Sequence, residues 1–167
     1  LYSVDDFKHI VRAFRRIIPD ITLATDVICG FPGESPEAFE RTLQLIEQVK
    51  PDIVNVSKFF PRPRTAAEKM TPKVSPSEVR NRSRQMANLA KRIALENNSK
   101  WMNWRGPILF DERGKQPNTL VGRNFAYKPV AVRSGDETLL GTRAEIQVVR
   151  TLQTHLEANL LANRVVQ

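Results

Sequence analysis

Residues 24–34 read Ala24-Thr25-Asp26-Val27-Ile28-Cys29-Gly30-Phe31-Pro32-Gly33-Glu34. The apolar run up to Cys29 predicts a buried strand, and the glycines on either side of a proline predict a tight loop after it. Ser35 and Pro36 then begin a helix, because serine caps helices and proline fits their first position. Loops after the carboxyl ends of strands carry the active sites of α/β barrels, so this loop is a site candidate. An ordinary turn between strand and helix is the alternative.

The neighbouring segments predict a parallel unit of two strands joined by a helix. Residues 4–17 form an amphipathic helix that begins with the capping pair Ser3 and Asp6. Residues 21–29 and 52–60 form strands on either side of the helix from Pro36, and such a connection is right-handed. The prolines in 61–65 end the second strand in another loop, at the same sheet edge as the first loop. A long basic helix follows from residue 75 to about residue 97.

The composition changes near Asn97-Asn98-Ser99, where helical periodicity stops. Short strands separated by turns follow, which is typical of a small antiparallel barrel. We expect them at 106–110, 119–121, 129–132, 139–142, 145–149 and 154–161. The predicted domains are therefore 1–97, of the α/β class, and 98–167, a β-barrel.

The composition excludes several classes of protein. With 41% hydrophobic residues among 167, the chain is globular, and it lacks an apolar run long enough to span a membrane. Cys29 is the single cysteine, so neither an internal disulfide nor a multi-cysteine metal site is possible, and His9 and His155 lie too far apart in sequence to suggest zinc. The chain begins with Leu1 and lacks a signal-peptide pattern, from which we expect a cytoplasmic protein whose chain begins upstream.

The net charge of +8 is concentrated in the middle of the chain. Residues 58–115 contain 14 basic and 5 acidic residues, whereas the remainder contains 12 basic and 13 acidic residues. This distribution indicates contact with nucleic acid, and a solvated basic helix face is the alternative. On the long helix we expect a basic track formed by Arg80, Arg82, Arg84, Lys91 and Arg92.

Three motifs, in this order, resemble the radical S-adenosylmethionine methylthiotransferases. They are residues 25–34, then Phe60-Pro61-Arg62-Pro63-Arg64-Thr65, then a barrel carrying Val121-Gly122-Arg123-Asn124-Phe125-Ala126-Tyr127-Lys128-Pro129-Val130. The resemblance is narrower to the archaeal and eukaryotic branch that modifies threonylcarbamoyladenosine next to the tRNA anticodon. It implies the end of a radical-SAM partial barrel followed by a TRAM domain, which is an OB-like, RNA-binding barrel. The family's CxxxCxxC loop and amino-terminal domain are missing, so we interpret the chain as a carboxyl-terminal fragment that is inactive alone.

The resemblance also implies cofactors and their sites. The parent enzyme would use S-adenosylmethionine and two [4Fe-4S] clusters, and the cysteine of this chain holds neither cluster. Asp26 would point toward the cofactor or support the loop, with Arg62 as its partner. Arg62 would alternatively bind the cofactor carboxylate or a tRNA phosphate. The residues expected to bind the cofactor are Asp26, Ile28, Gly30, Phe31, Pro32, Gly33, Glu34 and Arg62.

For tRNA, the expected contacts combine cationic and aromatic side chains, as recognition of loop RNA requires. Phe125 is either a stacking residue or part of the core, whereas Trp101 and Trp104 are expected to pack between the domains. Arg64 replaces a glycine common in the family, so the loop there either changes shape or gains a phosphate contact. The expected RNA-binding residues are Arg62, Arg64, Arg113, Arg123, Asn124, Tyr127 and Lys128.

Two other functions remain open from the sequence. One is a methylthiotransferase that modifies an aspartate of a ribosomal protein, although the basic Arg62 in Pro61-Arg62-Pro63 favours tRNA over that substrate. The other is an RNA-binding module without radical chemistry.

Overall fold

The computed structural model describes residues 3–166 and divides the chain into two compact units. The strand-helix unit comprises Leu23–Ile93, and the barrel unit comprises the segment up to Thr22 together with the chain from Ala94 onward. The division falls within helix α4 (Pro76–Ser99), which contributes residues to both units. None of the helices in the described part of the chain is long and apolar enough to cross a membrane.

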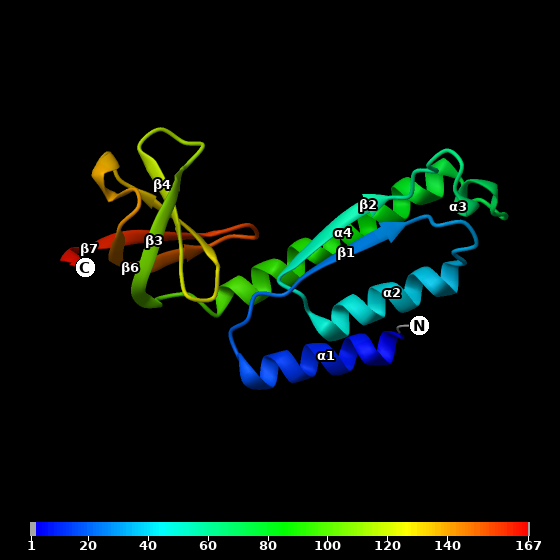
Figure 1. Ribbon diagram of the computed structural model, residues 1–167, viewed down its shortest axis with the longest axis horizontal. Helices are drawn as coiled ribbons and strands as arrows, with labels where there is room; N and C mark the ends of the chain where they lie inside the picture. The colour runs from blue at the N-terminus through cyan, green and yellow to red at the C-terminus, as the bar shows by residue number, and fades with distance from the viewer. Residues whose placement is uncertain (1–2, 167) are drawn as a thin grey trace. The chain divides into compact units, whose positions relative to one another are not determined.

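The strand-helix unit contains two parallel strands joined by a helix, as the sequence predicts (Figure 1). In the β1–β2 pairing, Ala24 lies opposite Ile53 and Cys29 opposite Lys58. The Ser35 side chain caps α2 by accepting from the Ala38 amide at 3.2 Å, and α2 ends at Lys50 in the left-handed region with φ of 49°. Besides α4, the elements are β1 (Ala24–Cys29), α2 (Pro36–Val49), β2 (Ile53–Lys58) and α3 (Ala66–Lys69).

One face of this strand pair is covered by helices and the other is open. Val27 and Cys29 of β1 pack with apolar side chains of α2 and α4, which removes that face from water. Because side chains alternate along a strand, the opposite face presents Asp26, Ile28 and Asn55, and all three are exposed. The open face therefore carries the polar pair Asp26 and Asn55, whereas Thr25 and Lys58 lie on the other face. The core cluster consists of Val27, Cys29, Phe39, Ile46, Met86 and Ile93.

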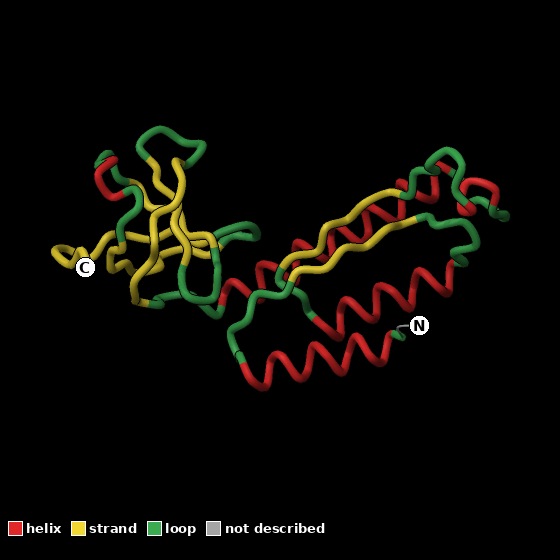
Figure 2. Tube along the Cα trace, in the orientation of Figure 1, coloured by secondary structure: helices red, strands yellow, loops and turns green. Residues whose placement is uncertain are grey.

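The barrel unit contains a closed five-stranded barrel in the order β3-β4-β5-β7-β6, which confirms the predicted small barrel (Figure 2). The neighbouring strands are antiparallel except for β5 and β7, which pair in parallel. This topology is compatible with a small OB-like barrel. The elements are α1 (Val4–Ile17), β3 (Arg105–Arg113), β4 (Thr119–Arg123), β5 (Pro129–Arg133), the 3-10 helix η1 (Glu137–Leu139), β6 (Arg143–Thr151) and β7 (Leu156–Val166).

The prediction of a strand at 139–142 is wrong. The helix η1 (Glu137–Leu139) ends there instead, and its N-cap is Asp136, whose side chain accepts a hydrogen bond from the Thr138 amide. Gly141, with φ of 78°, then turns the chain toward β6. The short helix α3 was not expected, and β1 begins at Ala24 rather than at residue 21.

The core of the barrel is formed by alternate residues of its strands. Ile108, Phe110, Val130 and Ile146 are completely or almost completely buried. Trp101 belongs to the same core cluster and Trp104 packs against it, while their expected place between the two domains stays a prediction. Among the described residues, each strand of the closed barrel has a paired neighbour on both sides.

Candidate functional site

The loops after β1 and β2 lie at the same edge of the sheet, as predicted. The backbone amide of Phe59, directly after β2, donates to the carbonyl oxygen of Cys29 at 2.8 Å. The Phe31 and Phe59 rings meet edge to face with their centroids 5.2 Å apart. Parallel pairing therefore brings the two predicted loops together, two residues beyond the end of β1 and one residue beyond the end of β2.

The first loop depends on two glycines in the left-handed region. Gly30 has φ of 85° and Gly33 has φ of 82°, which L-residues with a side chain rarely adopt. A Cβ at position 30 would lie 2.4 Å from a methyl carbon of Val79 on α4, whereas a Cβ at position 33 would meet nothing within 4 Å. The Gly33 amide also donates to the carbonyl oxygen of Pro72 at 2.8 Å. Both the backbone conformation and the packing against Val79 therefore favour glycine at position 30, whereas the backbone conformation alone favours it at position 33.

Glu34 and Arg82 hold this loop against α4. Glu34 Oε2 accepts from the Gly30 amide at 2.8 Å and from Arg82 Nη1 at 2.8 Å. Arg82 Nη1 also donates to the Glu34 carbonyl oxygen at 2.8 Å, while its Nε donates to Glu78 at 2.9 Å. Burial lowers the pKa of the Arg82 guanidinium, but its hydrogen bonds with Glu34 and Glu78 outweigh burial and raise it. We call Glu34, Glu78 and Arg82 the carboxylate-arginine cluster.

This cluster changes the interpretation of two residues. Arg82 is only 3% exposed, so it does not belong to the exposed basic track expected on α4. Arg92 of the same expected track forms an ion pair with Glu47. The sequence shows the spacing of Glu78 and Arg82 on one helix face, but the third member, Glu34, lies 48 residues from Arg82. Glu34 was expected to face a cofactor, whereas its carboxylate is bound within the protein.

Asp26 does not pair with Arg62 as expected. Its Oδ1 instead accepts from Asn55 Nδ2 at 2.8 Å, and the two residues are aligned across β1 and β2. Ile28, two residues further along β1, shares this open face and is exposed. In the loop itself, Phe31 and Gly33 are exposed whereas Pro32 is buried. An accessible surface therefore lies beside the glycine loop, and it is formed by the pair Asp26 and Asn55 together with Ile28 and Phe31.

The second loop keeps a left-handed backbone at Arg64, where φ is 66°. The arginine therefore adopts a conformation that favours glycine, and its contact with an RNA phosphate stays a prediction. Two hydrogen bonds stabilise it: the Arg64 amide donates to Glu68 Oε2 at 2.7 Å, and Thr65 Oγ1 donates to the Arg62 carbonyl oxygen at 2.8 Å. Both arginine side chains are exposed.

The turn between β4 and β5 separates the expected RNA-binding residues into two groups. Asn124 and Lys128 are each 5% exposed. Asn124 Oδ1 accepts from the amides of Ala126 and Lys128 at 3.1 and 2.9 Å, and Lys128 Nζ donates to Asn98 Oδ1 at 3.0 Å. These two side chains build the turn from inside. Their contact with RNA stays a prediction.

The aromatic residues of this turn point outward. Phe125 is 71% and Tyr127 69% exposed, so the core alternative for Phe125 is not what the structure shows. The Arg123 guanidinium lies over the Tyr127 ring at 4.7 Å and pairs with Asp111 at 3.1 Å. Phe125 contacts the rings of Trp101 and Trp104, with centroids 5.7 and 6.2 Å away.

A cavity of about 350 Å³ lies beside this turn. Asn124 Nδ2 is buried and has no hydrogen-bond partner within the described part of the protein. A buried donor without a partner is costly, and it indicates a place where a water molecule or a ligand accepts. The cavity is lined by Pro107, Ile108, Leu109, Asp111, Arg123, Asn124, Phe125, Tyr127 and Arg143. Arg113 is not among the residues that line this cavity. Its guanidinium donates two hydrogen bonds to the carboxylate of the exposed Glu137.

The residues described by the structure do not form a metal site. They include no group of three histidine, cysteine, aspartate or glutamate side chains placed to hold an ion. Cys29 is fully buried, and its pKa is raised by burial and by the nearby Glu34 charge. An iron-sulfur cluster needs several thiolate ligands, so these residues do not fit one.

Comparison with known proteins finds homologues of this chain. A protein of Pyrococcus horikoshii, called a probable threonylcarbamoyladenosine tRNA methylthiotransferase, is 38% identical over 162 residues, which are 96% of this chain and 37% of that protein. The chain is homologous to threonylcarbamoyladenosine tRNA methylthiotransferases. A protein of that name from Drosophila pseudoobscura pseudoobscura is 31% identical over 160 residues, covering 96% of this chain and 28% of the relative.

Homologues with a related name also match. A tRNA-2-methylthio-N(6)-dimethylallyladenosine synthase of Pelobacter propionicus is 32% identical over 160 residues, 96% of this chain and 36% of the relative. The chain thus spans about a third of the length of the curated relatives that it matches. No family model matches the chain.

Proposed function

We propose that this chain is part of an enzyme that converts N6-threonylcarbamoyladenosine next to the tRNA anticodon to its 2-methylthio derivative. The observation that supports this proposal most strongly is the 38% identity, over 96% of the chain, to the Pyrococcus horikoshii relative named for this substrate. The chain would supply the end of a radical-SAM partial barrel and a TRAM domain that binds the tRNA. Such an enzyme would act in the cytoplasm, where tRNA is modified.

Within that enzyme, the open face of β1 and β2 and the glycine loop would form part of the wall around S-adenosylmethionine. The pair Asp26 and Asn55, together with Ile28, offers polar and apolar groups beside a loop whose backbone can approach a ligand closely. S-adenosylmethionine supplies radical chemistry and a methyl group when it is bound. The carboxylate-arginine cluster would keep the loop in place from below, since its members contact the loop and α4.

The iron-sulfur clusters of such an enzyme would be held by residues outside this chain. Cys29 is the single cysteine of the chain and is buried in the core between the strands and the helices, whereas a cluster needs several thiolate ligands. We therefore assign these residues no step that involves a cluster.

The barrel would bind the anticodon region of tRNA through the exposed side chains of the turn between β4 and β5. Phe125 and Tyr127 present aromatic faces for stacking, and Arg123 adds a cation beside them. Asn124, whose side-chain oxygen accepts from the amides of Ala126 and Lys128, would hold the turn in the shape that presents these side chains. Lys128 would act indirectly by supporting the turn.

A second substrate is favoured by a specific observation. Some homologues, including the Pelobacter propionicus protein, are named for dimethylallyladenosine rather than threonylcarbamoyladenosine. Both names describe an adenosine that carries a substituent on N6, one a polar carbamoyl amino acid and the other an apolar chain. If the enzyme acted on the second substrate, the tRNA nucleoside would differ from threonylcarbamoyladenosine only in the group on N6.

Mass spectrometry of tRNA nucleosides from cells lacking the protein tests the proposal. We expect the methylthio derivative of threonylcarbamoyladenosine to disappear while threonylcarbamoyladenosine itself remains. Loss of the dimethylallyl derivative instead would support the second substrate. Unchanged methylthiolated nucleosides would refute both, and would leave the interpretation as an RNA-binding module.

A further inference from the structure

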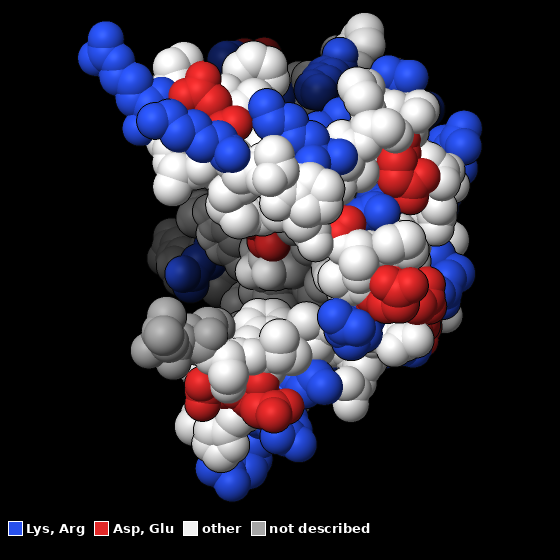
Figure 3. Space-filling model, turned by 90° about the vertical axis from the view of Figure 1, so that its right-hand side faces the viewer, with Lys and Arg blue, Asp and Glu red and all other residues white. Residues whose placement is uncertain are grey.

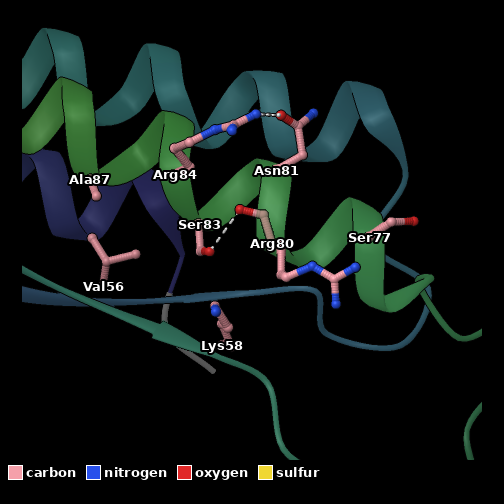
Figure 4. A pocket seen from close by; sticks show the side chains of 8 residues that line it. All are labelled: Val56, Lys58, Ser77, Arg80, Asn81, Ser83, Arg84 and Ala87. Atoms are coloured by element: carbon pink, nitrogen blue, oxygen red, sulfur yellow. Dashed lines mark hydrogen bonds between the residues drawn. The ribbon is translucent and has the colours of Figure 1, made fainter.

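A basic groove lies in the strand-helix unit between β2 and α4. It has a volume of about 590 Å³ and does not include the glycine loop or the barrel. Figure 4 shows Lys58 reaching from the end of β2 toward the helix, with Arg80 on α4 beside it. We call it the β2–α4 groove, and its lining residues are Val56, Lys58, Ser77, Arg80, Asn81, Ser83, Arg84 and Ala87.

The lining of this groove is one-sided in charge. Lys58, Arg80 and Arg84 supply three cations, and no acidic residue is found among the described residues that line it. Glu78 lies on the same helix, but it pairs with the buried Arg82 at 2.9 Å. The Glu78 carboxylate is therefore bound by the buried Arg82, and the lining of the groove itself contributes cations and no carboxylate.

The two arginines lie one helical turn apart and so share a face of α4. Like charges at this spacing destabilise a helix by a few tenths of a kcal/mol. An anion bound beside these arginines would reduce this repulsion, and Figure 4 shows the Arg84 side chain directed toward Asn81 rather than toward Lys58. Arg84 Nη2 donates to Asn81 Oδ1 at 3.3 Å, and Ser83 Oγ donates to the Arg80 carbonyl oxygen at 3.0 Å, which accounts for the polar side chains seen in Figure 4.

The form of the groove favours an extended polyanion over a single small anion. Its three cations come from two elements, and its apolar side, Val56 and Ala87, suits the sugar part of a nucleotide. Figure 3 shows acidic side chains set among the lysines and arginines on one face of the molecule, so the high net charge does not make that face uniformly basic. The described residues that line the groove, in contrast, carry cations and no carboxylate.

We propose that the β2–α4 groove binds the phosphate backbone of RNA, as a second contact besides the turn of the barrel. The proposal rests on the proposed function, because tRNA is the partner that it supplies. Phosphate contacts position an RNA without reading its sequence, so the groove would contribute affinity and orientation rather than specificity. An acidic peptide is the competing occupant, and the experiment below separates the two.

The test is binding of a synthetic anticodon-arm RNA to the purified protein at several salt concentrations. We expect the combined change Lys58→Ala, Arg80→Ala and Arg84→Ala to weaken binding by about tenfold or more. The slope of log affinity against log salt should fall by about 2, because about 0.7 to 0.9 of a counterion is released per phosphate neutralised. The loss should be equal for RNAs of different sequence.

The matched control is the combined change Arg12→Ala, Arg16→Ala and Arg41→Ala, which removes the same charge from exposed positions on α1 and α2. Equal affinity and slope in the two triple variants would overturn the proposal. Preferential loss of poly-glutamate binding, with RNA binding kept, would also overturn it in favour of a peptide. Circular dichroism and thermal unfolding should show both variants folded. RNA binding that is intact in every variant would contradict the proposal for the groove and leave the proposed function standing. Unchanged tRNA nucleosides in the knockout would contradict the proposed function.

Discussion

Arg82 is the residue on which the conformation of the glycine loop most depends. It is buried, and it joins the side chain and the carbonyl oxygen of Glu34 to α4. We expect Arg82→Met, which keeps much of the side-chain volume, to lower the free energy of unfolding by about 3–5 kcal/mol, because it leaves the 13% exposed Glu34 carboxylate without its cation. Urea unfolding measures the change. The control Arg84→Met, at an exposed position, should stay within about 0.5 kcal/mol, and equal effects would contradict the role of Arg82.

The two glycines of the loop allow a paired prediction at the same scale. Gly30→Ala adds both a left-handed alanine and a clash with Val79, so it should destabilise the protein by about 2–4 kcal/mol. Gly33→Ala adds backbone strain without a clash and should cost about 1–2 kcal/mol. Thermal or urea unfolding of the two variants checks the order. A larger loss for Gly33→Ala than for Gly30→Ala would show that the packing against α4 is not as described.

Cys29 provides a prediction about pH. Its pKa is raised by burial and by the Glu34 charge, so the folded protein holds the thiol proton more tightly than the unfolded chain does. Its contribution to stability is therefore present below the unfolded pKa of about 8.5 and is lost as the pH rises above it. Urea unfolding at about pH 7.5 and about pH 9.5 should show a larger loss for the wild type than for Cys29→Ala. Fast reaction of the folded protein with a thiol reagent at neutral pH would contradict the burial.

The turn between β4 and β5 is the element in which strain and proposed function coincide. Tyr127 has φ of 63°, a conformation that a tyrosine adopts at a cost of about 1–2 kcal/mol, yet its ring is exposed. Tyr127→Gly relieves that strain and loses the contact with Arg123, so we expect the stability to change by less than about 1 kcal/mol. Binding of anticodon-arm RNA should weaken by about fivefold or more, since stacking on an aromatic ring is worth about 1–3 kcal/mol per base.

Tyr127→Phe is the control for this element. It keeps the ring and the left-handed backbone, so its RNA affinity should equal that of the wild type. Loss of affinity in both variants would assign the effect to the hydroxyl group, and unchanged affinity in Tyr127→Gly would exclude stacking at this position.

Elements with strong local signals were predictable from the sequence. The capping box of Ser3 and Asp6 and the Ser35-Pro36 start fixed the beginnings of α1 and α2, because caps act over three residues. The 139–142 segment has apolar residues that suit a strand, but the Asp136 cap and the positive φ of Gly141 favour η1 and a turn. Local hydrogen bonds therefore outweighed the apolar pattern there.

The candidate site was predictable only as far as its loops. Parallel pairing of two strands brings their ends to one edge, so the closeness of the two loops followed from the order of the elements. The partner of Asp26 did not, because Asn55 opposes it only through the register of β1 and β2. The burial of Arg82, Asn124 and Lys128 also depends on tertiary contacts that spacing does not encode.

At the scale of the whole molecule, the two units have separate cores, and this leads to a final prediction. The barrel cluster is drawn from Trp101 to Ala158, whereas the strand-helix cluster lies between Val27 and Ile93. We expect Ile146→Ala to lower amide-exchange protection in the barrel and Met86→Ala to lower it in the strand-helix unit, each by about 2–5 kcal/mol. Both side chains are fully buried, so the two changes are matched.

Hydrogen exchange read by mass spectrometry assigns the loss to each unit. The barrel is closed and should keep its protection in Met86→Ala, because every strand of the barrel is paired on both sides. The strand pair β1–β2 has two open edges, and two strands alone are marginal, so its protection should be the lower of the two in the wild type as well. A uniform loss of protection over the chain in either variant would mean that the two cores unfold as one, and would contradict the division into units.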